Sequence, residues 1–155
     1  MIRLIPFLWF SDRAEDAARL YTSIIPDSRI DRVWTMASEG DPPDGTRVVE
    51  FTLAGSPVAI MQAAGGTPIN MAISLMIECD DQAQIDAIWD GLLDGGTALQ
   101  CGWLTDRYGV SWQVTPRRLL EMQTSPDRAA AARAAQAMMG MVKLDIVALE
   151  AAFAG

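Results

Sequence analysis

The chain has 155 residues, half of them hydrophobic, and its 12 Lys and Arg against 20 Asp and Glu give a net charge of −8. This length can bury a substantial core, and an acidic chain without a basic run is poorly suited to a phosphate backbone. No stretch approaches 18 uninterrupted apolar residues. We therefore expect one globular domain in the cytoplasm, with neither nucleic acid nor a membrane as a partner.

The first part of the chain predicts the order strand, helix, strand, strand, strand. Residues 4–10 are almost continuously apolar, which is typical of a strand buried on both faces. Asp12 and Glu15 have the spacing of a capping box and should begin a helix with an apolar face from Ala14 to Ile25. The other expected strands are at residues 30–36, 47–53 and 57–62, with a loop from Ser38 to Gly45 after the first of them.

The same order is then expected a second time. An apolar run at residues 71–79 is followed by Asp81 and Gln84, which repeat the capping spacing before a helix that ends at Gly95. The remaining strands are expected at residues 97–99, 101–104 and 110–115, and helices at 117–123, 129–139 and 143–153. We predict module one at about residues 1–64, module two at about 68–116 and a helical tail at about 117–155. Whether the tail covers a sheet or a partner subunit stays open.

The strand after the polar turn at residues 106–109 has alternating character. Val110, Trp112 and Val114 should share one face and Gln113 the other, because strand side chains alternate with period two. A small-molecule site is mostly apolar with a few placed polar groups. The residues that could line one are Phe7, Trp9, Met61, Gln62, Met76, Cys101, Trp103, Trp112 and Gln113. The alternatives are ordinary core for the apolar members, solvated strand positions for the glutamines and an inert buried thiol for Cys101.

The repeated order resembles the vicinal oxygen chelate superfamily, which includes glyoxalase, bleomycin-resistance proteins and extradiol dioxygenases. Residues 5–10 (IPFLWF), 100–104 (QCGWL), 106–113 (DRYGVSWQ) and 149–155 (LEAAFAG) are similar to its PhnB-like branch, often labelled demethylubiquinone methyltransferase. The resemblance implies an α+β fold of two βαβββ modules whose curved sheets enclose a cavity, in a single glyoxalase-like domain at 1–155 with a C-terminal helical tail. It also implies a homodimer.

Metal-dependent members of the superfamily place His, Gln or Glu ligands on the first and last strands of each module. This chain has no histidine, and the corresponding strands offer only Gln62 and Gln113, whose neutral amide oxygens are weak ligands. We therefore expect neither a catalytic metal nor another cofactor. The methyltransferase label meets a similar difficulty, because residues 10–13 lack the glycine-rich turn of a doubly wound S-adenosylmethionine enzyme.

Three hypotheses follow from the sequence. The first is a protein that binds a small organic molecule in an apolar cavity without a catalytic metal. The second is a glyoxalase-like or dioxygenase-like enzyme that uses Gln62, Gln113 and a neighbouring carboxylate. The third is a domain that assembles with a partner protein. The missing metal ligands favour the first.

Overall fold

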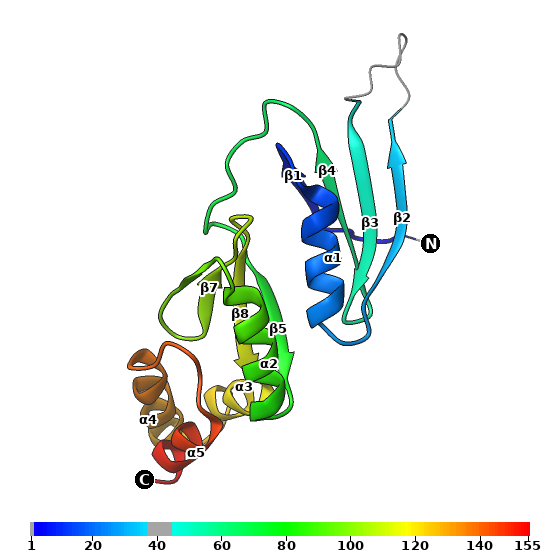
Figure 1. The fold of residues 1–155 in the computed structure, drawn as a ribbon. Helices are drawn as coiled ribbons and strands as arrows, with labels where there is room; N and C mark the ends of the chain where they lie inside the picture. Colours follow the sequence, from blue (N-terminus) through cyan, green and yellow to red (C-terminus); the bar gives the residue numbers. More distant parts are fainter. Residues whose placement is uncertain (1, 37–44) are drawn as a thin grey trace. The chain divides into compact units, whose positions relative to one another are not determined.

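The structure, a computed structural model, describes residues 2–36 and 45–155. Most of the loop expected from Ser38 to Gly45 therefore lies outside the described residues. The chain divides into two compact units, unit 1 at residues 1–69 and unit 2 at residues 70–155 (Figure 1). The boundary between the units falls close to the predicted change from module one to module two.

Unit 1 has the predicted order of strand, helix and three strands. Its elements are β1 (Phe7–Phe10), α1 (Ala14–Ile24), β2 (Arg29–Thr35), β3 (Arg47–Leu53) and β4 (Ser56–Gln62). They form one four-stranded sheet in the order β1-β4-β3-β2. The β1–β4 pair is parallel and the other two pairs are antiparallel. The crossover through α1 therefore brings the first strand beside the last.

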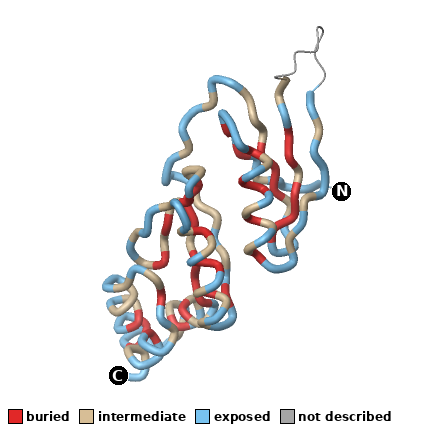
Figure 2. Tube along the Cα trace, in the orientation of Figure 1, coloured by how far each residue is buried: buried red, intermediate tan, exposed pale blue. Residues whose placement is uncertain are grey.

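The core of unit 1 lies between α1 and one face of the sheet. Ala14, Ala17 and Ala18 are fully buried on α1, and small side chains let a helix approach a sheet closely. The ring of Tyr21 on the same helix lies 6.4 Å from that of Phe51 on β3. Figure 2 shows the buried stretches of α1, β3 and β4 in red. The helix covers only this face, which leaves the opposite face of the sheet open.

The open face overturns one expectation about β1. Leu8 and Phe10 are buried, but Phe7 and Trp9 are 56% and 42% exposed. The strand is apolar on both faces without being buried on both. Because isolated surface apolar residues are common but contiguous ones are not, the exposed aromatic pair needs an explanation beyond core packing.

The capping box predicted from Asp12 and Glu15 does not form. Helix α1 begins at Ala14 after Arg13, which has a left-handed φ of 53° and provides no side-chain cap. The Ala14 N–H instead donates to Gln62 Oε1 at 3.0 Å. Glu15 forms ion pairs with two arginines, its helix neighbour Arg19 and one on β3. A residue 48 positions away therefore replaces the local cap.

Unit 2 repeats the fold and adds the tail. Its elements are β5 (Leu75–Cys79), α2 (Gln82–Leu93), β6 (Thr97–Ala98), β7 (Trp103–Thr105), β8 (Ser111–Pro116), α3 (Arg117–Gln123), α4 (Arg128–Met139) and α5 (Ile146–Ala154). The sheet order β5-β8-β7-β6 matches that of unit 1, with β5 parallel to β8. Here the predicted cap is confirmed, because Asp81 Oδ1 accepts from the Gln84 N–H at 2.8 Å. The α+β class with two βαβββ modules and a helical tail is confirmed.

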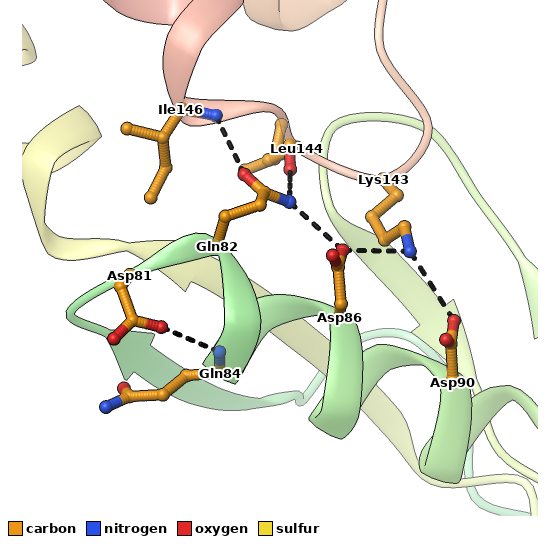
Figure 3. Close-up of polar contacts among 8 residues, drawn as sticks. All are labelled: Asp81, Gln82, Gln84, Asp86, Asp90, Lys143, Leu144 and Ile146. Carbon is orange, nitrogen blue, oxygen red and sulfur yellow. Dashed lines mark hydrogen bonds and ion pairs between the residues drawn. The ribbon is translucent and has the colours of Figure 1, made fainter.

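The tail helices form a small core of their own and dock on α2. Leu119, Met122, Ala134, Leu144 and Leu149 make up the buried cluster. Gln82, in the first turn of α2, donates to the Leu144 carbonyl at 3.1 Å and accepts from the Ile146 N–H at 3.0 Å (Figure 3). The tail therefore packs on α2 of its own unit.

A second contact holds the segment between α4 and α5. Lys143 Nζ lies 2.9 Å from Asp86 and 3.5 Å from Asp90, both on α2 (Figure 3). The backbone N–H groups of Cys101 and Gly102 donate to carbonyls of the same segment at 2.8 Å each.

Among the described residues, no helix combines the length and the apolar character that crossing a bilayer requires.

Candidate functional site

Three of the predicted site residues lie on the open face of the unit 1 sheet. In the parallel β1–β4 pair, Trp9 is the register partner of Met61, and Phe7 is the partner of Ala59. Phe7, Trp9 and Met61 therefore point to the same side, away from α1. The Trp9 indole N–H donates to the Ala63 carbonyl at 3.1 Å, which ties the ring to the segment after β4.

Gln62 does not join these residues. As the neighbour of Met61 on β4 it points to the helix side, where its Oε1 caps α1 through the Ala14 N–H. Its amide oxygen is thus already an acceptor within the fold. The prediction that Gln62 lies with the aromatic residues is wrong, because the period of two places adjacent strand residues on opposite faces.

Three more predicted residues form a row across the unit 2 sheet. Gln113 on β8 is the register partner of both Met76 on β5 and Trp103 on β7, so all three side chains share one face. Gln113 Nε2 donates to Ser74 Oγ at 2.8 Å, which fixes the amide with its oxygen available as an acceptor. Met76 is 48% exposed. The row combines two large apolar groups with one oriented polar group, the composition typical of small-molecule sites.

Trp112 lies on the opposite face, in the core of unit 2. Its side chain is 1% exposed, and its indole N–H donates to Asp106 Oδ2 at 2.8 Å. The other carboxylate oxygen accepts from the N–H groups of Tyr108 and Val110, so Asp106 organises the turn before β8. Trp112 is therefore a core residue and does not line the candidate site. The alternation of β8 correctly predicts that Trp112 and Gln113 lie on opposite faces.

The two cysteines lie away from both open faces. Cys101 is in the turn before β7 with φ = 62°, and its Sγ lies 3.8 Å from Met139 Sδ at the end of α4. It is thus part of the contact with the tail and does not belong to the row of Met76, Trp103 and Gln113. Cys79 is fully buried, and burial, followed by the nearby charges of Asp80 and Asp81, raises the pKa of its thiol to about 11. Such a thiol stays protonated at neutral pH.

A cavity of about 500 Å³ opens on unit 1 beside Phe7. We call it the unit 1 cavity; its lining residues are Arg3, Ile5, Phe7, Arg29, Asp31, Arg32, Glu50, Phe51, Thr52, Pro57, Val58 and Ala59. Its walls are thus part apolar and part charged, and the charged residues were not among those that the sequence predicted for the site. Its volume is within the range of small-molecule sites.

Sequence reasoning missed the charged wall, most of which the pairing of β2 with β3 assembles. Arg32 on β2 is the register partner of Glu50 on β3, and its Nε and Nη2 bind that carboxylate at 2.8–3.1 Å. The Trp34 indole N–H donates to Glu50 Oε1 at 3.0 Å. Hydrogen bonds from Arg32 and then Trp34 lower the pKa of Glu50, with a smaller contribution from the charge of Arg3. Only cross-strand pairing could have revealed this group, and a bulge at residues 30–32 disturbs the alternation.

No metal centre is evident in the part of the chain that the structure describes. Within residues 2–36 and 45–155, no three His, Cys, Asp or Glu side chains lie close enough together to hold an ion. The two glutamines expected at ligand positions are engaged with the Ala14 N–H and with Ser74. The donor set of these strands therefore does not fit a metal site.

A sequence model of the family described as 3-demethylubiquinone-9 3-methyltransferase matches residues 2–115. The chain belongs to this family. The match ends before α3, so the docked tail lies beyond the part that the family shares. No curated protein matches the chain.

Solved structures share the fold of this chain. A PhnB protein from Bacillus cereus is 30% identical, with 74% of this chain aligned to 99% of that one at a TM-score of 0.65. Protein PA1353 from Pseudomonas aeruginosa is 18% identical over 75% of this chain and 98% of its own, at a TM-score of 0.58. The fosfomycin resistance protein FosX from Listeria monocytogenes is 11% identical over 79% and 96%, at 0.56. The family thus has the fold of the vicinal oxygen chelate superfamily.

Proposed function

We propose that this protein binds a small organic molecule on the open faces of its sheets, with the unit 1 cavity as the principal site. The observation that supports this most is the placement of Phe7, Trp9, Met76 and Trp103 on strand faces that no helix of their own unit covers. Contiguous apolar side chains in such a position are typical of ligand or partner surfaces.

Metal-assisted catalysis does not enter the proposal. FosX from Listeria monocytogenes has been solved with Mn(II), at 13% identity to this chain. The corresponding strands here present Gln62, engaged in capping α1, and Gln113, bonded to Ser74, and a divalent ion needs charged oxygen or imidazole ligands. The methyl transfer in the family's description is not part of the proposal either, because residues 10–13 lack the glycine-rich turn of a doubly wound S-adenosylmethionine enzyme.

The test is a titration with N-phenyl-1-naphthylamine, a neutral aromatic probe that fluoresces in apolar surroundings. Phe7→Ser should raise the dissociation constant about fivefold, since it removes a large apolar contact from the wall of the unit 1 cavity. Val147→Ser is the matched control, because Val147 is 76% exposed on α5 and belongs to neither face. Absence of probe binding, or equal affinity of Phe7→Ser and Val147→Ser, would refute the proposal.

We also propose that the protein is a homodimer, as the family resemblance implies. Association could cover some of the same exposed residues, so dimerisation and ligand binding need separate measurements. Light scattering of the wild type and of Phe7→Ser distinguishes them. A dimeric Phe7→Ser variant with weakened probe binding would assign Phe7 to the ligand, whereas a monomeric variant would assign it to the dimer interface.

A further inference from the structure

The unit 1 cavity has an excess of positive charge in an otherwise acidic chain. Three arginines, Arg3, Arg29 and Arg32, line it together with only two carboxylates, Asp31 and Glu50. The whole chain has a net charge of −8. A local reversal of sign at a concave surface attracts ions of the opposite charge, because low-dielectric walls focus the field.

Both carboxylates of this wall are already engaged by donors of the protein. Glu50 accepts hydrogen bonds from two nitrogens of Arg32 and from the indole N–H of Trp34. Asp31 accepts the Thr52 hydroxyl at 2.7 Å and pairs with Arg29 Nε at 2.8 Å. Little acceptor capacity remains for a cationic ligand.

The arginines, by contrast, keep donors to spare. A guanidinium has five N–H groups. Within the described residues Arg3 has no ion-pair partner, Arg29 uses only Nε and Arg32 uses only Nε and Nη2. Arg3 is also close enough to Glu50 for its charge to act on that carboxylate. The unused donors fit the oxygens of an anionic group, which guanidinium groups bind well.

Next to these donors the wall is apolar. Ile5, Phe7, Pro57 and Ala59 line the same cavity, and Phe7 and Ala59 are register partners on adjacent strands. We propose that the unit 1 cavity selects organic anions, with a carboxylate or sulfonate group held by Arg3 and an apolar body against Ile5 and Phe7. This deepens the proposed function, on which it rests, by naming the chemical class of its ligand.

A matched pair of probes tests the inference. 1-Anilinonaphthalene-8-sulfonate and N-phenyl-1-naphthylamine share one ring skeleton, and only the first has an anionic group. Arg3→Met should raise the dissociation constant of the sulfonate about fivefold and leave that of the neutral probe unchanged. Loss of one charge-assisted hydrogen bond at a partly exposed site weakens binding by about this factor. Arg19→Met is the control, because it removes the same charge from α1, on the covered side of the sheet.

The wild-type protein supplies a second measurement that needs no variant. Raising the salt concentration should weaken binding of the sulfonate and leave the neutral probe unaffected, because salt screens a charge contact. Binding of the neutral probe together with equal sulfonate affinity in Arg3→Met and Arg19→Met would overturn the inference and leave the proposed function standing. If neither probe binds the wild type, both proposals fail.

Discussion

Gln82 should be the residue that holds the C-terminal tail in place. It makes two hydrogen bonds to the tail, one from its amide nitrogen to the Leu144 carbonyl and one to its oxygen from the Ile146 N–H (Figure 3). Each bond of this kind contributes about 0.5–1.5 kcal/mol net. Because the site is only partly buried, water can replace some of this, and Gln82→Ala should lower the free energy of unfolding by about 1.5 kcal/mol.

Two measurements check this value. A chain of this size should lose about 3–6 °C in melting temperature. If the tail detaches as a local unit, the amides of α5 should exchange hydrogen about tenfold faster, as a loss of about 1.4 kcal/mol implies. Gln84→Ala is the control, since Gln84 lies on the same helix and, within the described residues, its side chain bonds only to the Asp80 N–H. Equal exchange of the α5 amides in both variants would refute the role of Gln82.

Gln82→Glu separates the two bonds. The new carboxylate can still accept from the Ile146 N–H, but it cannot donate to Leu144 and it faces Asp86, to which the native amide donates at 3.1 Å. We expect this variant to be less stable than Gln82→Ala at pH 7, because two carboxylates then repel each other. The order should reverse near pH 3, where protonation restores a donor. A constant order across this pH range would contradict the geometry.

Three further outcomes follow from the structure. Gly102→Ala should cost about 2–3 kcal/mol in urea unfolding, because at φ = +80° its Cβ would lie 2.8 Å from a tail side chain, whereas Gly109→Ala, with φ = +88° and open space, should cost only about 1 kcal/mol. The hydrogen bond between Lys143 and Asp86 lowers the pKa of Asp86 from its ordinary 3.8 and raises the pKa of Lys143 from its ordinary 10.5. Wild type should therefore be more stable than Lys143→Met at neutral pH. This difference should vanish as the pH falls through the lowered pKa of Asp86, and also as the pH rises through the raised pKa of Lys143. With the pKa of Cys79 near 11, a thiol reagent at pH 8 should label one cysteine in the native protein and both after denaturation; two labelled native thiols would contradict its burial.

Sequence reasoning succeeded where the information is local. The order of elements, the helix at residues 117–123 and the Asp81 cap of α2 all depend on neighbours within a few positions. It failed for the Asp12 cap because Arg13 takes a left-handed φ of 53°, so the helix begins at Ala14, whose N–H donates to the distant Gln62 side chain. A capping motif in the sequence identifies a side chain that can accept hydrogen bonds from the first N–H groups of a helix. Tertiary contacts decide whether that side chain or a distant one accepts them.

The candidate site shows the same difference between what local sequence predicts and what tertiary structure decides. The choice of large apolar residues and Gln113 came from residue type, and the structure places six of the nine chosen residues on the open sheet faces, three in each unit. Gln62, Trp112 and Cys101 lie elsewhere. The charged wall of the unit 1 cavity was missed, because its members are ordinary surface residues until strand register brings them together.

By itself the sequence determined two repeats of strand, helix and three strands, because hydrophobic periodicity and turn residues act over short distances. It also determined that histidine chemistry is excluded. Only the tertiary structure decided which face of each sheet the helix covers, that the tail docks on α2 through Gln82, and that arginines gather beside Phe7. These depend on the register between strands far apart in the chain, and a shift of one residue would send every side chain of a strand to the opposite face.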